Sequence, residues 1–183
     1  MNKLLISNKM KKIITILFFL SISSLINAQL IHTKGKMGVG VRGGIGWIKS
    51  NKAYNFGLMY HYYTSNKTGI FVEIDREKAS FEYSNFTNHF LLGAGFEYAV
   101  WKPCKWLYMN LSIAGNFGYD EWDCTALEWT ERHFIGGANG GFALEAYPWH
   151  FLSVMIKARQ FILFGKGMNY LKPDFSLGLK YNW

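Results

Sequence analysis

Large apolar residues alternate with small or polar ones along most of the chain beyond residue 35. The C-terminal segment shows the pattern most clearly. Every odd position from Phe175 to Trp183 is large and apolar or aromatic, whereas every even position from Ser176 to Asn182 is Ser, Gly, Lys or Asn. A period of two predicts a β-strand with two different faces. Eight segments carry it: about Lys36–Trp47, Ala53–Thr64, Gly69–Lys78, Asn88–Trp101, Leu107–Tyr119, His133–Tyr147, Phe151–Phe164 and Phe175–Trp183.

The segments between the predicted strands also follow a pattern. Proline cannot donate to a strand ladder, so we expect Pro103, Pro148 and Pro173 to lie between strands. Short connections at residues 65–68, 102–106 and 148–150 alternate with longer ones at residues 79–87, 120–132 and 165–173, and residues 49–52 are a short exception. Short periplasmic turns and longer external loops are typical of outer-membrane barrels with periplasmic termini.

The N-terminus has the features of a secretory signal peptide. Lys11 and Lys12 precede a largely apolar run from Ile13 to Leu25, and Ala28 supplies a small residue for cleavage. The apolar run is shorter than the roughly 18 residues of a membrane-spanning helix. Met10 onward is already a complete signal peptide. We therefore expect a signal peptide over residues 1–28 and one β-barrel domain over residues 29–183.

Removing the signal peptide changes the charge and the size of the chain. It lowers the formal net charge from +8 to +4, because the removed segment contains four lysines and no acid. So mild an excess does not predict direct contact with nucleic acid. The remaining 155 residues suffice for one domain and contain no apolar stretch long enough for a spanning helix. The prediction is an all-β fold, a single eight-stranded antiparallel up-and-down transmembrane β-barrel.

Alternation alone does not say which face of the barrel points outward. A soluble, lipocalin-like periplasmic barrel would have its apolar face inside. Here the second face consists largely of Gly, Ala, Ser and Asn, which suits a narrow lumen. The predicted periplasmic strand ends also carry tryptophans, as an aromatic girdle at a membrane interface requires. These girdle residues, which favour the membrane barrel, are Trp101, Trp106, Trp149 and Trp183.

Several charged residues fall on the face predicted to line the lumen. They are Glu73, Glu97, Glu145, Lys157, Arg159 and Lys180. Eight strands enclose an interior that side chains can fill, and buried charges are normally paired. We expect a luminal ion-pair network that plugs the barrel, in which Lys157 and Arg159 pair with Glu97 and Glu145.

The segment 120–132 combines acidic residues with two tryptophans in a basic chain. Exposed aromatic residues on a loop are typical of contacts with a protein partner. The alternative is that both tryptophans fold back as an upper aromatic girdle. The candidate partner-contact residues are Asp120, Glu121, Trp122, Asp123 and Trp129.

Residues capable of catalysis are present but show no specific spacing. An outer-leaflet hydrolase would use His89 or His133 beside Ser80, Glu82 or Glu131. We expect these to be rim residues and the protein not to be an enzyme.

The two cysteines and the glycines of the first strand predict no cofactor site. Cys104 and Cys124 fall on opposite sides of a spanning strand, so we expect two unpaired thiols. The G-x-G-x-x-G pattern at residues 38–43 lies inside a predicted strand, without the helix that dinucleotide binding needs. No Cys/His spacing predicts a metal site.

The C-terminal half of the chain contains a series of short motifs. They are Gly-Tyr-Asp at 118–120, Phe-Ile-Gly-Gly-Ala-Asn-Gly-Gly at 134–141, Glu-Ala-Tyr at 145–147, Arg-Gln-Phe-Ile-Leu-Phe-Gly at 159–165, Lys-Pro at 172–173 and Gly-Leu-Lys-Tyr-Asn-Trp at 178–183. With them the chain resembles the TraO family of Bacteroidetes conjugative transposons, which usually has Gly-Tyr-Glu first and more often ends in Phe. The likeness covers residues 108–183 well and residues 29–98 only in pattern.

The resemblance implies a non-enzymatic outer-membrane β-barrel component of a conjugative mating apparatus. It implies outer-membrane lipid and other proteins of the apparatus as partners, and it supplies no catalytic or cofactor-binding residue. Two alternatives are a small barrel of porin or adhesin type unrelated to transfer, and an outer-leaflet hydrolase that modifies lipid A.

Overall fold

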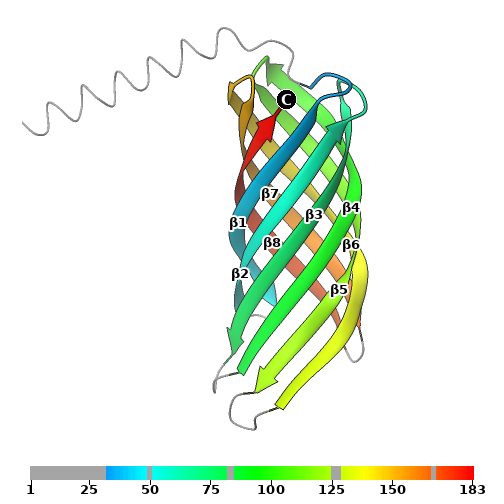
Figure 1. The fold of residues 1–183 in the computed structure, drawn as a ribbon, viewed down its shortest axis with the longest axis vertical. Helices are drawn as coiled ribbons and strands as arrows, with labels where there is room; N and C mark the ends of the chain where they lie inside the picture. Colours follow the sequence, from blue (N-terminus) through cyan, green and yellow to red (C-terminus); the bar gives the residue numbers. More distant parts are fainter. Residues whose placement is uncertain (1–31, 49–50, 82–84, 125–128, 166–167) are drawn as a thin grey trace, which may run out of the picture.

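Eight antiparallel strands, each paired with its neighbours in sequence, form a closed barrel (Figure 1). The computed structural model describes residues 32–48, 51–81, 85–124, 129–165 and 168–183. Pairing of the last strand with the first closes the wall, which confirms the predicted up-and-down barrel. The strands are β1 (Met37–Ile48), β2 (Asn51–Tyr63), β3 (Thr68–Phe81), β4 (Asn85–Cys104), β5 (Leu107–Cys124), β6 (Trp129–Trp149), β7 (Leu152–Gly165) and β8 (Met168–Asn182).

The two faces of each strand differ as the alternation predicted. Large apolar side chains point outward on every strand, and Ile113 on β5 is 64% exposed. Charged side chains such as Glu73 and Arg159 are buried inside. So large an exposed apolar surface indicates a membrane-facing wall, because soluble monomers rarely expose such patches. A lipocalin-like arrangement would require the opposite orientation. Within the described ranges, no helix is long and apolar enough to cross a membrane.

The predicted long loops are mostly strand. Residues 120–124 belong to β5 and residues 129–132 to β6, while β7 and β8 extend through the other residues described between 165 and 173. The predicted strands end where the apolar alternation ends, but the backbone ladder continues with polar residues. The two ends of the barrel therefore differ in the length of their hairpins. In Figure 1 the C-terminus lies at the upper end, here called the terminal end, and the β5–β6 hairpin projects furthest at the far end.

All three prolines lie within strands, which corrects the prediction that they lie between strands. Pro103 and Pro148 occur where the β4–β5 and β6–β7 registers shift. Pro173 lies one residue past the last β1–β8 pair, Gly46 with Asp174. At a register shift or past the end of a ladder, the missing proline N–H costs no regular strand hydrogen bond.

Candidate functional site

The lumen at the terminal end holds a cluster of buried aromatic and charged residues. We call this the terminal-end cluster, and it consists of His32, Tyr63, Tyr108, Glu145, Tyr147 and Lys180. His32 precedes β1, yet it is only 2% exposed, and its ring stacks on Tyr108 with 3.8 Å between the centroids. Its Nε2 lies 3.1 Å from the Tyr147 hydroxyl. The segment before β1 thus inserts a side chain into the mouth of the barrel.

Backbone geometry explains how His32 reaches the lumen. Gly35 has a φ of 89°, a conformation that glycine adopts without strain, so the chain can turn between His32 and β1. Its N–H donates to the Tyr63 carbonyl at 2.8 Å. Burial lowers the pKa of His32 despite the nearby Glu145 carboxylate, 3.5 Å from Nε2. The sequence around His32 contains no motif that predicts its position in the barrel mouth.

Charged and polar side chains bind several of the polar atoms around these rings. Lys180 Nζ lies 2.6 Å from the Glu145 carboxylate and donates to the Tyr63 hydroxyl at 2.7 Å. Ser153 donates to the same carboxylate at 2.6 Å. Glu97 accepts a hydrogen bond of 2.9 Å from the Asn110 amide.

The middle of the lumen contains a charge-balanced group that we call the central cluster. Its members are Arg42, Lys157, Arg159, Glu73, Asp75 and Asp174. Arg159 lies 2.6 Å from Glu73, 3.2 Å from Asp75 and 2.8 Å from Asp174. Three cations face three carboxylates from β1, β3, β7 and β8, so the cluster ties opposite walls of the barrel together.

The predicted partners of the central cations are wrong. Lys157 lies 3.3 Å from Glu73, and Arg159 also pairs with Glu73, whereas Glu145 pairs with Lys180. Glu97 lies 3.5 Å from the His61 imidazole. Because the strands are tilted, residues at one depth of the lumen come from opposite walls, and depth could not be read from sequence spacing.

Crowding in the centre explains one of the inward-facing glycines. A Cβ on Gly57 would overlap the Asp75 carboxylate and press on the Arg42 guanidinium. The Arg42–Asp75 ion pair therefore occupies the space of a missing side chain.

The far end of the lumen contains a third group, the far-end cluster. It consists of Glu77, His89, Asp120 and Lys172. The buried apolar residues at this end are Leu91, Ile135, Phe161 and Leu163. His89 lies between two acids, with Nε2 3.1 Å from Asp120 and Nδ1 3.9 Å from Glu77. Lys172 forms an ion pair with Glu77. Sequence analysis missed Lys172 and Asp174, because both lie in or next to a segment predicted as loop.

The predicted partner-contact residues do not share one environment. Asp120 is buried in β5 and faces His89, which corrects its placement in an exposed loop. The half-buried Trp122 donates from its indole N–H to Asp120. Glu121 accepts a 2.9 Å hydrogen bond from Arg132, and Asp123 accepts one from Thr130 at 3.3 Å. Trp129 begins β6, and its side chain lies outside the described residues.

In the β5–β6 hairpin, β6 extends past its neighbour β7. β6 pairs with β5 from Trp129 onward, but its first pair with β7 is Ile135 with Gly165. In the described part of the chain, the other edge of β6 over residues 129–134 therefore has no strand partner. Phe134, at the base of this projection, is 90% exposed.

Three of the four predicted girdle tryptophans face outward at the terminal end. Trp101, Trp149 and Trp183 are exposed, and Trp183 stacks on Tyr181 with 5.9 Å between centroids. Trp106 instead packs in the turn after β4 against the Tyr108–Tyr147 pair. Its position in a turn over the barrel mouth directs it inward, which corrects its assignment to the girdle.

The residues considered for hydrolysis do not come together. His89 is inside the lumen, whereas Ser80 is exposed on the outer face of β3. His133 lies 3.2 Å from Glu131 at the rim, and Glu82 lies outside the described residues. Opposite strand faces separate the hydroxyl from His89, so these residues form no nucleophile–base pair.

The described residues also contain no group of three or more His, Cys, Asp or Glu side chains placed to hold a metal ion. Cys104 is a free thiol, as predicted. It ends β4, whereas Cys124 ends β5 at the other end of the barrel.

Comparison with protein families gives a match over the whole barrel. Residues 33–183 match the family described as conjugative transposon protein TraO. The chain belongs to the TraO family. The match also includes the N-terminal strands, whose sequence resembles the family only in its pattern. Comparison of this TraO chain with curated proteins found no match.

Solved structures similar to the TraO barrel are outer-membrane proteins. The N-terminal β-barrel domain of Pseudomonas aeruginosa OprF is 13% identical, with a TM-score of 0.61, and the alignment covers 82% of this chain and 98% of that one. Neisserial surface protein A is 12% identical, with a TM-score of 0.60 and coverage of 80% and 95%. Ail, the attachment invasion locus protein of Yersinia pestis, is 13% identical, with a TM-score of 0.56 and coverage of 82% and 100%. At these identities the likeness shows the fold alone.

Proposed function

We propose that this TraO chain is a non-enzymatic outer-membrane component of a conjugative mating apparatus. The family match over residues 33–183 is the observation that carries the proposal. The outward apolar belt supports insertion in the outer membrane, with residues 1–28 cleaved as a signal peptide and residues 29–183 as the barrel domain. The partners would be outer-membrane lipid and other proteins of the apparatus.

The projecting β5–β6 hairpin is the proposed contact with these proteins. It carries the charged residues Glu121, Asp123 and Arg132 on its outer face. The edge of β6 over residues 129–134 could accept an extended strand of a partner by backbone hydrogen bonding. Charged side chains along such an edge restrict unspecific pairing. The three luminal clusters would stabilise the barrel wall that carries the hairpin. Their side chains fill the lumen and so plug it.

Transfer frequency tests the proposal directly. Donor cells that lack the gene should transfer the element poorly, and the parent gene should restore transfer. The test variant shortens the β5–β6 hairpin by replacing residues 123–130 with a two-residue Asn-Gly turn. The new turn directly connects Trp122 and Glu131, which are paired across the two strands. The variant should assemble as a heat-modifiable barrel yet fail to restore transfer.

A second shortened hairpin serves as the control for this experiment. Replacing residues 81–85 between β3 and β4 by the same turn shortens another far-end hairpin. This control should restore transfer. Unchanged transfer without the gene would refute the conjugative function, whereas full restoration by the shortened β5–β6 variant would refute only the contact surface.

Labelling would test the proposed orientation. In a background with Cys104→Ser and Cys124→Ser, single substitutions Asp123→Cys at the far end and Lys105→Cys at the terminal end place one thiol on each side. A membrane-impermeant maleimide should label only the far-end thiol in intact cells. Labelling of only the terminal-end thiol would mean that the barrel is inserted in the opposite direction.

A further inference from the structure

The outer wall of β2 and β3 carries cations close to the far end of the barrel. Arg76 and Lys78 are exposed at positions that continue the outward apolar series Ile70, Val72 and Ile74 of β3, and Lys52 is exposed on β2. In the register, Arg76 lies between Phe56 on β2 and Phe90 on β4. Its guanidinium is therefore at the margin of the apolar belt, where an unpaired charge is unfavourable.

No protein carboxylate neutralises this guanidinium in the described part of the chain. The chain neighbours of Arg76 are Asp75 and Glu77, but both are buried on the luminal face and pair with Arg42 and Lys172. The sheet separates them from the outer face. An anion stabilises a guanidinium at the edge of the hydrocarbon region, and lipid headgroups can supply one.

A groove of about 310 Å³ lies beside Arg76 on the outer wall. It is lined by Arg76, Asn88, Phe90, Tyr119 and Glu121, together with His89. The rings of Phe90 and Tyr119 stack with 5.6 Å between centroids. The side-chain oxygen of Asn88 is buried there without a hydrogen-bond partner, while the Glu121 carboxylate is engaged by Arg132.

These groups match the chemistry of a phosphorylated headgroup. A guanidinium binds phosphate oxygens in a fork and is less strongly hydrated than an ammonium group. Lys78, two residues beyond Arg76 on the same face, adds a second cation. The Asn88 oxygen can accept a hydrogen bond from a hydroxyl group, and the stacked rings suit the interface between headgroups and acyl chains.

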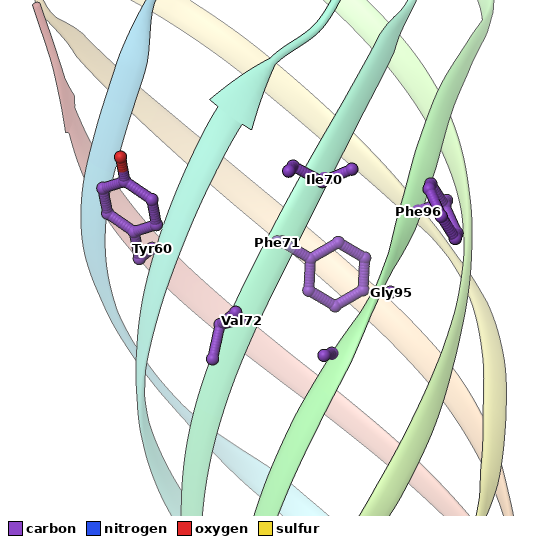
Figure 2. A pocket seen from close by; sticks show the side chains of 7 residues that line it. Tyr60, Ile70, Phe71, Val72, Gly95 and Phe96 are labelled. Atoms are coloured by element: carbon purple, nitrogen blue, oxygen red, sulfur yellow. The ribbon is translucent and has the colours of Figure 1, made fainter.

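A second hollow lies in the same apolar wall, nearer the middle of the membrane. Figure 2 shows Tyr60, Ile70, Val72 and Phe96 around it, and Ala94 is the small residue that leaves space between them. Its volume is about 300 Å³. Val72 is four residues from Arg76 along β3, or roughly 13 Å along the strand, and the strand tilt makes the difference in depth smaller. The hollow is therefore within reach of an acyl chain whose headgroup lies at Arg76.

We propose that β3 and β4 bind one phosphorylated glycolipid of the outer leaflet. Its phosphate lies on Arg76 and Lys78, its sugar contacts Asn88 and the stacked rings, and an acyl chain fills the hollow at Ala94. The proposal rests on the orientation given above, in which the far end of the barrel is external. It does not depend on the role in conjugation.

Native mass spectrometry of the folded full-length barrel tests this site. The probes are lipid A and the same lipid A with its phosphate removed, offered together in detergent micelles. The parent should retain phosphorylated lipid A, and Arg76→Gln with Lys78→Gln should reduce that adduct about tenfold, the effect of losing charge-assisted bonds to one phosphate. Lys67→Gln with Lys105→Gln, which removes two exposed cations at the terminal end, should leave it unchanged.

The hollow has its own matched pair of variants. Ala94→Leu should fill the hollow and reduce the lipid A adduct, whereas Ala138→Leu on the outer face of β6 should not. Heat-modifiable migration establishes that every variant is folded. Equal retention of the phosphate-free lipid, or parent-like binding by the Arg76/Lys78 variant, would overturn the site. Preference for phosphatidylglycerol over lipid A would overturn the assignment to the outer leaflet.

Discussion

Arg159 is one of two side chains, with Arg42, that each pair with three acids in the described part of the lumen. It contacts Glu73, Asp75 and Asp174, which come from two different strands. Arg159→Met would leave these carboxylates with too few cations in a water-poor lumen, and breaking a buried pair on one side costs about 3–5 kcal/mol. We expect the free energy of unfolding in urea to fall by that amount.

The next residue along β7 provides the control for Arg159. Gln160 is exposed on the outer face, so Gln160→Met changes the membrane-facing surface and leaves the central cluster intact. Its free energy of unfolding should change by less than about 1 kcal/mol. Equal stability of the two variants would show that the central cluster does not stabilise the barrel.

His32 makes the closure of the terminal end dependent on pH. Because burial lowers its pKa below the ordinary 6.5, the undocked imidazole binds a proton more readily than the docked one. Docking is therefore complete above that pH and weakens as the pH falls below it. Glu145 opposes this effect, while Lys180 and Lys102 reinforce it.

Hydrogen exchange at Gly35 measures the docking of His32. Its N–H is bonded to the Tyr63 carbonyl, so its protection factor should be lower at about pH 5 than at about pH 8. In a His32→Phe variant the stacking remains and the titrating group is gone, so the protection factor should be the same at both values. A pH-independent protection factor in the parent would contradict the prediction.

At the scale of the elements, Trp183, the residue after β8, extends the seam between β8 and β1. The Trp183 N–H donates to the Met37 carbonyl at 3.0 Å, and the Met37 N–H donates to the Trp183 carbonyl at 3.1 Å. Deleting Trp183 removes both bonds and should lower the free energy of unfolding by about 1–3 kcal/mol. Trp183→Phe keeps the backbone pair and should match the parent. The measurement is the temperature at which the heat-modifiable band disappears, and equal temperatures for deletion and parent would contradict the role.

At the scale of the whole molecule, the outward surface divides into an apolar belt and polar projections. Ile113 faces outward within the belt on β5, whereas Thr130 lies on the projecting part of β6. Ile113→Arg should cost about 2–4 kcal/mol in a bilayer, and Thr130→Arg should cost about 1 kcal/mol or less. Unfolding from lipid vesicles measures both, and similar costs would place the hairpin within the hydrocarbon region.

The sequence by itself determined the number of strands, their two faces and the outward direction of the apolar face. The number of strands and their two faces follow from alternation between neighbouring residues such as Phe175 and Ser176, which is a local pattern. The outward direction follows from the small residues of the second face and from the tryptophans at the strand ends. The sequence also identified six of the charged residues of the lumen, because Glu73 and Arg159 interrupt the small-residue face of their strands.

Only the tertiary structure decided which charges meet, where the strands end and what closes the lumen. The Arg159–Glu73 pair depends on the tilt and register of strands on opposite walls. The buried position of Asp120 depends on a ladder that continues past the apolar belt. Docking of His32 depends on a cavity formed by three tyrosines from three strands, and no single stretch of sequence contains that information.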